Sequence, residues 1–138
     1  MILLDTNVVS ELMLAKPDLR VIRWLDRQPQ SSIWTTSIAV FEIRCGLQTM
    51  PAGKRQTGLA AFFDRWLHEV IQHRVAPFDD AAAQYAAGLF AERQKTGRPG
   101  ELRDTMIAGI VLASQATLAT RNVKHFDEIA ESVVNPWG

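Results

Sequence analysis

The sequence predicts an α/β fold in which helices cover both faces of a mostly parallel central sheet. Short apolar or β-branched runs recur along the chain and stop at polar residues, as buried strands do. Segments with apolar residues at helical spacing separate these runs. Strands that alternate with helices are typical of a sheet between two helical layers. The length of 138 residues suits one core, so we expect residues 1–138 to form a single domain.

The first half of the chain is expected to supply two strands and four helices. Asp18 can cap the second helix, and Pro17 and Pro29 end the helices that precede them. A Ser or Thr starts the third helix, and aromatic residues at helical spacing mark the fourth. In order, we expect a strand over residues 1–4, helices over 7–14 and 18–27, a strand over 32–36, and helices over 37–49 and 57–73.

The second half repeats the alternation. Asp79 or Asp80 caps a helix that runs to about residue 95, and the sequence TGRPG at residues 96–100 then breaks the chain. Residues 106–113 are apolar nearly all round, which predicts a buried helix. Strands are expected over residues 74–78, 117–120 and, at the edge of the sheet, 132–135.

Composition limits the classes of function. Lys and Arg together number 15, as do Asp and Glu, so the overall charge gives no footprint for nucleic acid or an anionic membrane. A single cysteine excludes an intrachain disulfide and fits a reducing compartment; Cys45 is expected to be a small buried core residue. No apolar run approaches a membrane span, and no basic segment precedes the first apolar run. We expect a cytoplasmic protein.

Asp5 directly follows the first apolar run, at the carboxyl end of the first predicted strand. In open α/β sheets ligands bind at that edge, where the strand order reverses. The alternative role is the N-cap of the following helix, which is a common role for Asp. Asp5 taken alone favours neither role.

Glu42 lies among apolar residues of the predicted helix over 37–49. Ile38, Phe41 and Cys45 lie at i−4, i−1 and i+3 from it. A buried carboxylate needs a partner, because its desolvation costs free energy. Arg44 projects to another side of the helix, so the partner is either an arginine from elsewhere or a ligand. We favour a functional role for Glu42.

Asp104 and Asn122 are two further candidates. Asp104 comes in the first turn of the buried helix, where the helix dipole also favours Asp, although Glu101 competes for that structural role. Asn122 follows the strand over residues 117–120, at a strand end like Asp5; an ordinary turn residue is the alternative.

Together these residues predict a metal site. Carboxylates gathered in one crevice repel one another unless a cation neutralises them, and oxygen ligands suit Mg²⁺ or Mn²⁺. The sequence has no Cys/His set for zinc, no motif of a serine-type triad and no phosphate-binding glycine loop.

Four segments resemble the PIN-domain family and, more narrowly, the VapC-type toxins of bacterial toxin–antitoxin pairs. They are MILLDTNVVSEL at the start, EIRCG from Glu42, RDTMIA from Arg103 and ATRN from Ala119. Their order and spacing match the family over essentially the whole chain, including Asn135, Pro136 and Trp137 near its end. The resemblance implies a PIN-like three-layer α/β/α sandwich.

The resemblance also implies a metal-dependent ribonuclease. Asp5, Glu42 and Asp104 would form the acidic cluster, with Asp5 and Asp104 as metal ligands and Glu42 either as a ligand or as the residue that orients the attacking water. Asn122 matches a fourth catalytic position that is Asp in many relatives, and His125 stands where many carry another acid. These two differences leave open whether one or two metals bind.

The resemblance further implies an RNA substrate and protein partners. The candidates for phosphate contacts are the basic residues that flank the proposed acids: Arg44, Arg98, Arg103, Arg121 and Lys124. Ordinary solvated surface or ion pairing is favoured for any single one of them. A cognate VapB-like antitoxin would lay a peptide or helix into an apolar groove. Aromatic residues around Trp24 and residues 62–66 would supply that groove, a dimer face or simply the core. We expect a homodimer and a toxin–antitoxin hetero-oligomer.

Two other functions remain compatible with the sequence. One is a PIN-like binding module with weak catalysis that acts with its antitoxin in a DNA-binding repressor complex, and Asn122 keeps it open. The other is a metal-dependent phosphatase with Asp5 as nucleophile. That chemistry usually requires a second acid two residues later, where this chain has Asn7. Cleavage of RNA rather than of nucleotide monoesters would separate the two enzymes.

Overall fold

The computed structural model describes residues 1–138 and contains one five-stranded sheet. Every pair of neighbouring strands is parallel, in the order β3-β2-β1-β4-β5. The strands are β1 (Ile2–Leu4), β2 (Ile33–Thr36), β3 (Val75–Ala76), β4 (Thr117–Ala119) and β5 (Val133–Val134). All five lie within the strands that the sequence predicts, and the mostly parallel sheet is confirmed as a fully parallel one.

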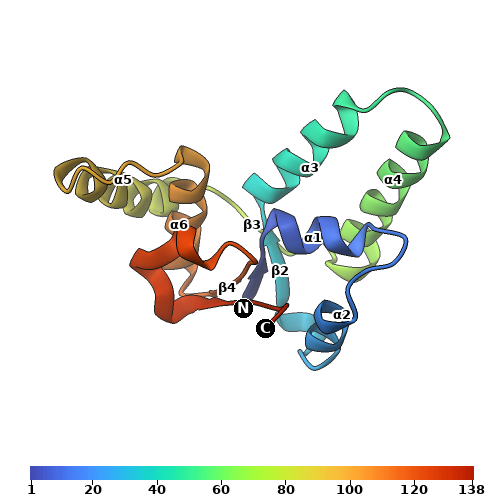
Figure 1. Ribbon diagram of the computed structural model, residues 1–138, viewed down its shortest axis with the longest axis horizontal. Helices are drawn as coiled ribbons and strands as arrows, with labels where there is room; N and C mark the ends of the chain where they lie inside the picture. The colour runs from blue at the N-terminus through green and yellow to red at the C-terminus, as the bar shows by residue number, and fades with distance from the viewer.

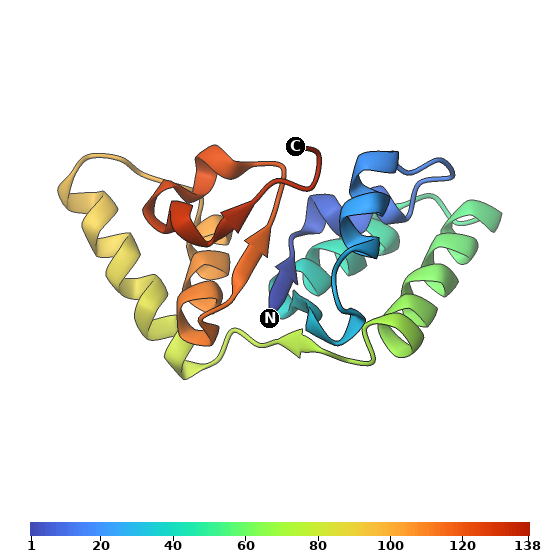
Figure 2. The same cartoon turned by 90° about the horizontal axis from the view of Figure 1, so that it is seen from below.

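Helices cover both sides of this sheet, as expected for three layers. One side carries α1 (Thr6–Leu12), α2 (Leu19–Asp26), α3 (Ser37–Thr49) and α4 (Lys54–Arg65). The other carries α5 (Asp80–Lys95), α6 (Leu102–Ser114) and a 3₁₀ segment over Val123–Ser132. Figures 1 and 2 show the two groups on opposite sides of the strands. None of the helices combines the length and the apolar character that crossing a membrane would need.

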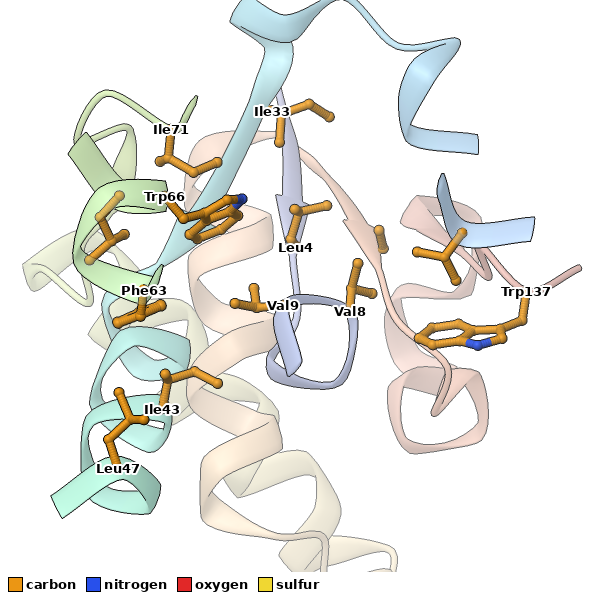
Figure 3. Close-up of a cluster of buried hydrophobic side chains, with 13 residues drawn as sticks. Leu4, Val8, Val9, Ile33, Ile43, Leu47, Phe63, Trp66, Ile71 and Trp137 are labelled. Carbon is orange, nitrogen blue, oxygen red and sulfur yellow. The ribbon is translucent and has the colours of Figure 1, made fainter. Parts of the chain in front are cut away.

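Each side of the sheet has its own core, because successive side chains of a strand point to opposite faces. Leu4 faces α1 to α4 and belongs to a cluster with Val9, Phe63 and Trp66, which Figure 3 shows on the same side of the strand. Leu3 faces the other side and packs with residues of β4, α6 and the 3₁₀ segment. The apolar run at the start of the chain therefore joins the two cores.

Caps explain most helix starts. Asp18 and Asp79 accept hydrogen bonds from the backbone N–H groups of Arg20 and Ala82, so of the two predicted candidates Asp79 caps α5. The Thr36 hydroxyl caps α3 in the same way by accepting from Ala39 N–H at 3.0 Å. The bounds of α3 agree with the predicted residues 37–49.

The helices differ from the prediction in several places, among them the end of α1 at Leu12 and a 3₁₀ turn over Gln30–Ser32. α4 begins directly after Gly53, at Lys54 rather than at residue 57. A π-helical turn over Trp66–Val70 follows it and places Trp66 and Leu67 in the core. α6 agrees with the prediction, since it begins at Leu102 and has Asp104 in its first turn, before the apolar residues 106–113. The 3₁₀ segment over Val123–Ser132 was not predicted.

The prediction that Cys45 is buried is wrong. Cys45 is exposed, and so is Phe41, which is 65% exposed. The buried face of α3 consists of Ala39, Ile43 and Leu47, which repeat at the four-residue spacing of a helix. Cys45 lies two residues from Ile43 and Leu47, and therefore on a different face of the helix.

Candidate active site

The order of the strands creates the crevice in which the site lies. β1 lies between β2 and β4, and the chain leaves β1 toward α1 on one side of the sheet but leaves β4 toward the 3₁₀ segment on the other. Such a reversal opens a crevice at the carboxyl ends of the two strands. Asp5 follows β1 and Thr120 follows β4, so both residues stand at this crevice.

Asp5 is fully buried and every one of its carboxylate contacts is polar. Its Oδ1 accepts the Thr6 backbone N–H at 2.8 Å, so Asp5 does cap α1. Its Oδ2 accepts the Thr120 hydroxyl at 2.8 Å, with the Asn7 amide at 3.5 Å. The two roles suggested by the sequence are therefore compatible, since one oxygen caps the helix while the carboxylate also faces the crevice.

Arg103 joins Asp5 to the other two predicted acids. From the first turn of α6 its guanidinium donates to Asp5 Oδ1, to Glu42 Oε1 at 2.8 Å and to Asp104 Oδ1 at 2.7 Å. The three acids come from the start of α1, from α3 and from α6. The structure thus brings together Asp5, Glu42 and Asp104, which we call the acid cluster, around one arginine.

Glu42 is half-buried at this cluster. Burial raises the pKa of its carboxyl, but hydrogen bonds from Arg103 and from the Thr6 hydroxyl, the latter 2.5 Å long, more than offset burial and hold the pKa below its ordinary value. Glu42 is therefore ionised at neutral pH. Phe41 and Cys45 do not bury Glu42, although they are its apolar neighbours in the sequence, because both of those side chains are exposed.

Asp104 borders a polar pocket. Its Oδ1 accepts from Arg103, and its Oδ2 lies 3.2 Å from His125 Nδ1. The pocket has a volume of about 290 Å³ and no apolar residue in its lining. Arg98 and Lys124 line it beside Asp104 and His125, so cationic side chains are available next to the acid cluster.

Asn122 is placed differently from the acids. It is exposed, and its side chain makes no hydrogen bond; its backbone N–H donates to the Thr120 hydroxyl at 3.1 Å, and its carbonyl oxygen accepts from the His125 backbone N–H at 3.0 Å. His125, one turn later, is the residue of this segment whose side chain reaches the acid cluster. The structure therefore places Asn122 beside the crevice but outside the network of hydrogen bonds.

The other two predicted arginines have partners away from the acids. Arg44 pairs with Asp64 of α4 at 2.6 Å and lies 4.9 Å from the centre of the Phe63 ring. Arg121 lies over the Trp137 ring, also at 4.9 Å. Ion pairing and cation–π contact are the ordinary surface roles of arginine.

Sequence reasoning missed two hydroxyl groups of the site. The Thr6 hydroxyl donates to Glu42 and accepts from Arg103, and the Thr120 hydroxyl donates to Asp5 and accepts from the Asn7 amide at 3.1 Å. Both residues adjoin the carboxyl end of a strand, and that position was the available signal. Their partners are far away in the sequence, so no local pattern could identify the hydrogen bonds.

The carboxylates of the acid cluster are chemically suited to a divalent cation, but the guanidinium of Arg103 fills the space between them. Three carboxylates on one crevice form the oxygen donor set that Mg²⁺ or Mn²⁺ prefers. In the structure no group of three acidic, His or Cys side chains is arranged to hold a metal ion. The acids instead meet through the guanidinium, a cation that the chain itself supplies.

Comparison with known proteins places the chain in a family. The PIN domain family matches residues 2–132. The chain is 37% identical to "VapC ribonuclease Y4jK" of Sinorhizobium fredii, over 99% of this chain and 98% of that protein. It is 31% identical to "Toxin FitB" of Neisseria gonorrhoeae, over 99% of each.

The fold agrees with a solved structure of the same group. "Structure of FitAB bound to IR36 DNA fragment" contains a chain that superposes with a TM-score of 0.89 at 32% identity and covers 100% of this chain and 96% of that one. A crevice with three acids at the reversal of a parallel sheet, a match to the family over almost the whole length and this superposition agree with one another. The chain belongs to the PIN-domain family and, within it, to the VapC/FitB-type toxins.

Proposed function

We propose that this protein is a metal-dependent ribonuclease that hydrolyses RNA phosphodiester bonds as the toxin of a toxin–antitoxin pair. The observation that carries the proposal is the convergence of Asp5, Glu42 and Asp104, from three separate elements, on one position at the crevice. The relatives named as a VapC ribonuclease and as a toxin support the same activity.

In this proposal the acid cluster holds Mg²⁺ or Mn²⁺. The ion, when bound, supplies Lewis-acid activation of the scissile phosphate and of water. Asp5 is fully buried and is fixed by hydrogen bonds from the Thr120 hydroxyl and the Thr6 backbone N–H, and Asp104 is buried in the first turn of α6, so both suit the role of ligands. Glu42 is more exposed and ionised at neutral pH, which suits either a ligand or a base that orients the attacking water.

RNA must reach the crevice across surfaces of mixed charge. Lys124 and Arg98 line the polar pocket next to Asp104 and are candidates for phosphate contacts, with Arg98 3.5 Å from Asp127. Arg44 and Arg121 would have to leave Asp64 and Trp137 to take that role. Asn122 is exposed at the same edge and is available to RNA rather than to the acids.

The experiment that tests the proposal uses protein freed of antitoxin and a mixed pool of structured RNAs. Cleavage is measured with Mg²⁺ or Mn²⁺ and with EDTA, for the wild type and for Asp5→Asn and Asp104→Asn. Asn caps helices about as well as Asp, so Asp5→Asn keeps the cap of α1 while it removes the charge and one of the two acceptor oxygens. We expect metal-dependent cleavage to fall by about 100-fold or more in both variants.

Asp79→Asn is the matched control, because Asp79 caps α5 as Asp5 caps α1 but is not part of the acid cluster. It should cleave like the wild type. Cleavage that continues in EDTA would refute the metal dependence. Neither cleavage nor metal binding by calorimetry would favour the alternative of a binding module that acts with its antitoxin.

We also propose an antitoxin as partner, seated in an apolar groove. The groove has a volume of about 500 Å³, and apolar residues supply most of its lining. Leu12 of α1, Ile22 and Leu25 of α2 and Phe62 of α4 contribute to it. Of the aromatic residues singled out in the sequence, Phe63 and Trp66 are buried in the core, and Phe62 is 38% exposed at the groove. An amphipathic helix suits such a surface.

A further inference from the structure

All three nitrogens of the Arg103 guanidinium bind the acid cluster. Nε donates to Glu42 Oε1, Nη1 to Asp104 Oδ1 and Nη2 to Asp5 Oδ1. These are the carboxylates proposed as metal ligands, so the cation of Arg103 and a divalent metal compete for the same oxygens.

With Arg103 as its only arginine, the acid cluster keeps an excess of negative charge. One guanidinium faces three carboxylates, and His125 approaches only Asp104. The excess of negative charge lies in a partly buried crevice, where repulsion between carboxylates is screened less than in water. A divalent cation would balance these charges better than the arginine does.

The surroundings of Arg103 allow its side chain to leave the acid cluster without disturbing the core. Its side chain is 23% exposed, and its remaining hydrogen bond goes to the Thr6 hydroxyl, which is itself part of the site. Arg103 has no partner outside the crevice. It comes from the first turn of α6, where a long side chain can turn toward solvent without moving the helix.

We propose that Arg103 is the resident counter-cation of the acid cluster, and that divalent metal binds only when the guanidinium swings out. This inference rests on the proposed function, since it concerns the same metal site. In the absence of metal, Arg103 reduces the repulsion between the three carboxylates. Because it competes for the same oxygens, it also lowers the affinity of the acid cluster for metal. The released guanidinium is then free for a phosphate group, the role that the sequence suggested for it.

The first test is the affinity for Mn²⁺, measured by calorimetry on protein stripped of metal. Arg103→Gln removes the competing charge and should bind Mn²⁺ at least about tenfold more tightly than the wild type. Arg103→Lys keeps the charge and should stay within about threefold of it. Arg65→Gln, which removes one charge from the exposed surface of α4, should not change the affinity. Equal or weaker binding by Arg103→Gln would overturn the proposal.

The second test follows the arginine in the wild-type protein, and Arg103→Lys serves only to assign its signal. In metal-free wild type the hydrogen-bonded Nε–H of Arg103 should give a protected signal in ¹⁵N NMR, assigned by its absence from Arg103→Lys. Saturation with diamagnetic Mg²⁺ should abolish the protection, because the guanidinium has left Glu42. A signal that stays protected in saturating Mg²⁺ would show that arginine and metal bind together and would refute the exchange.

The experiments can reject the nuclease function and the exchange of Arg103 for metal independently of each other. Loss of protection and tighter Mn²⁺ binding by Arg103→Gln, without any cleavage of RNA, would uphold the exchange and reject the nuclease. Metal-dependent cleavage together with a protected Arg103 signal would uphold the nuclease and reject the exchange.

Discussion

The Thr120 hydroxyl donates a hydrogen bond of 2.8 Å to Asp5 Oδ2 and thereby ties the carboxyl ends of β4 and β1 together. Both side chains are fully buried. The same hydroxyl accepts from the Asn7 amide and from the Asn122 backbone N–H. Thr120 is therefore a positioning residue, since it fixes the carboxylate that the proposed site requires.

We predict that Thr120→Val destabilises the protein by about 1–2 kcal/mol or more, because the hydrogen bonds of the hydroxyl to Asp5, Asn7 and Asn122 are lost without a change of shape. The loss of this support for Asp5 should also weaken Mn²⁺ binding by about 10-fold. Thr120→Ser, which keeps the hydroxyl, should recover most of the affinity. Thr117→Val at the start of β4 is the control and should leave Mn²⁺ binding unchanged. Calorimetry and urea unfolding measure the two effects, and an unaltered affinity in Thr120→Val would rule out the positioning role.

Gly109 of α6 packs directly against α5. A Cβ at this position would lie 2.5 Å from the Ala82 carbonyl oxygen and 2.8 Å from Ala86 Cβ. We predict that Gly109→Ala destabilises the fold by about 1–3 kcal/mol, because two helices must move apart. Gly88→Ala in α5 has open space around it and should stabilise by about 0.5–1 kcal/mol through helix propensity. Urea unfolding of both variants should give opposite signs; the same sign would contradict the close approach of the helices.

Glu128 and Arg93 form an ion pair beside the polar pocket. Hydrogen bonds from Arg93 outweigh burial and hold the pKa of Glu128 below its ordinary value of 4.5. The unfolded chain then binds the proton more readily, so the contribution of Glu128 is complete above pH 4.5 and is lost as pH falls through the folded-state pKa. We predict that Glu128→Gln costs about 2 kcal/mol at pH 7. The difference from the wild type should shrink as urea unfolding is repeated toward pH 3. A difference independent of pH would mean that the charge contributes nothing.

Phe62 tests the proposed antitoxin groove. Phe62→Glu places a charge in the apolar lining and should weaken binding of the cognate antitoxin by about 10-fold or more, as expected for an aromatic anchor. Phe90→Glu is the matched control, since Phe90 is 46% exposed on α5, on the other side of the sheet. Both variants should keep the stability of the wild type because neither side chain belongs to a core cluster. If calorimetry shows that both variants bind the antitoxin equally well, the antitoxin does not bind in this groove.

The sequence by itself determined the order of the elements and the parallel sheet. The apolar run over Ile2–Leu4 and the helix over Ser37–Thr49 follow from patterns within a few residues, and the caps at Asp18 and Asp79 are equally local. The acids Asp5 and Asp104 were found for the same reason, because the end of a strand and the first turn of a helix can both be recognised locally.

Only the tertiary structure decided how these residues contact one another. The hydrogen bonds of Arg103 to Glu42 and to Asp5 span 61 and 98 positions, and that of Thr120 to Asp5 spans 115. No periodicity along a chain encodes which side chain fills the space between three distant elements. The exposure of Cys45 and Phe41 was misjudged for a related reason. Two apolar stripes on α3 were possible, and the packing of α1 and α4 against this helix selected the face with Ile43.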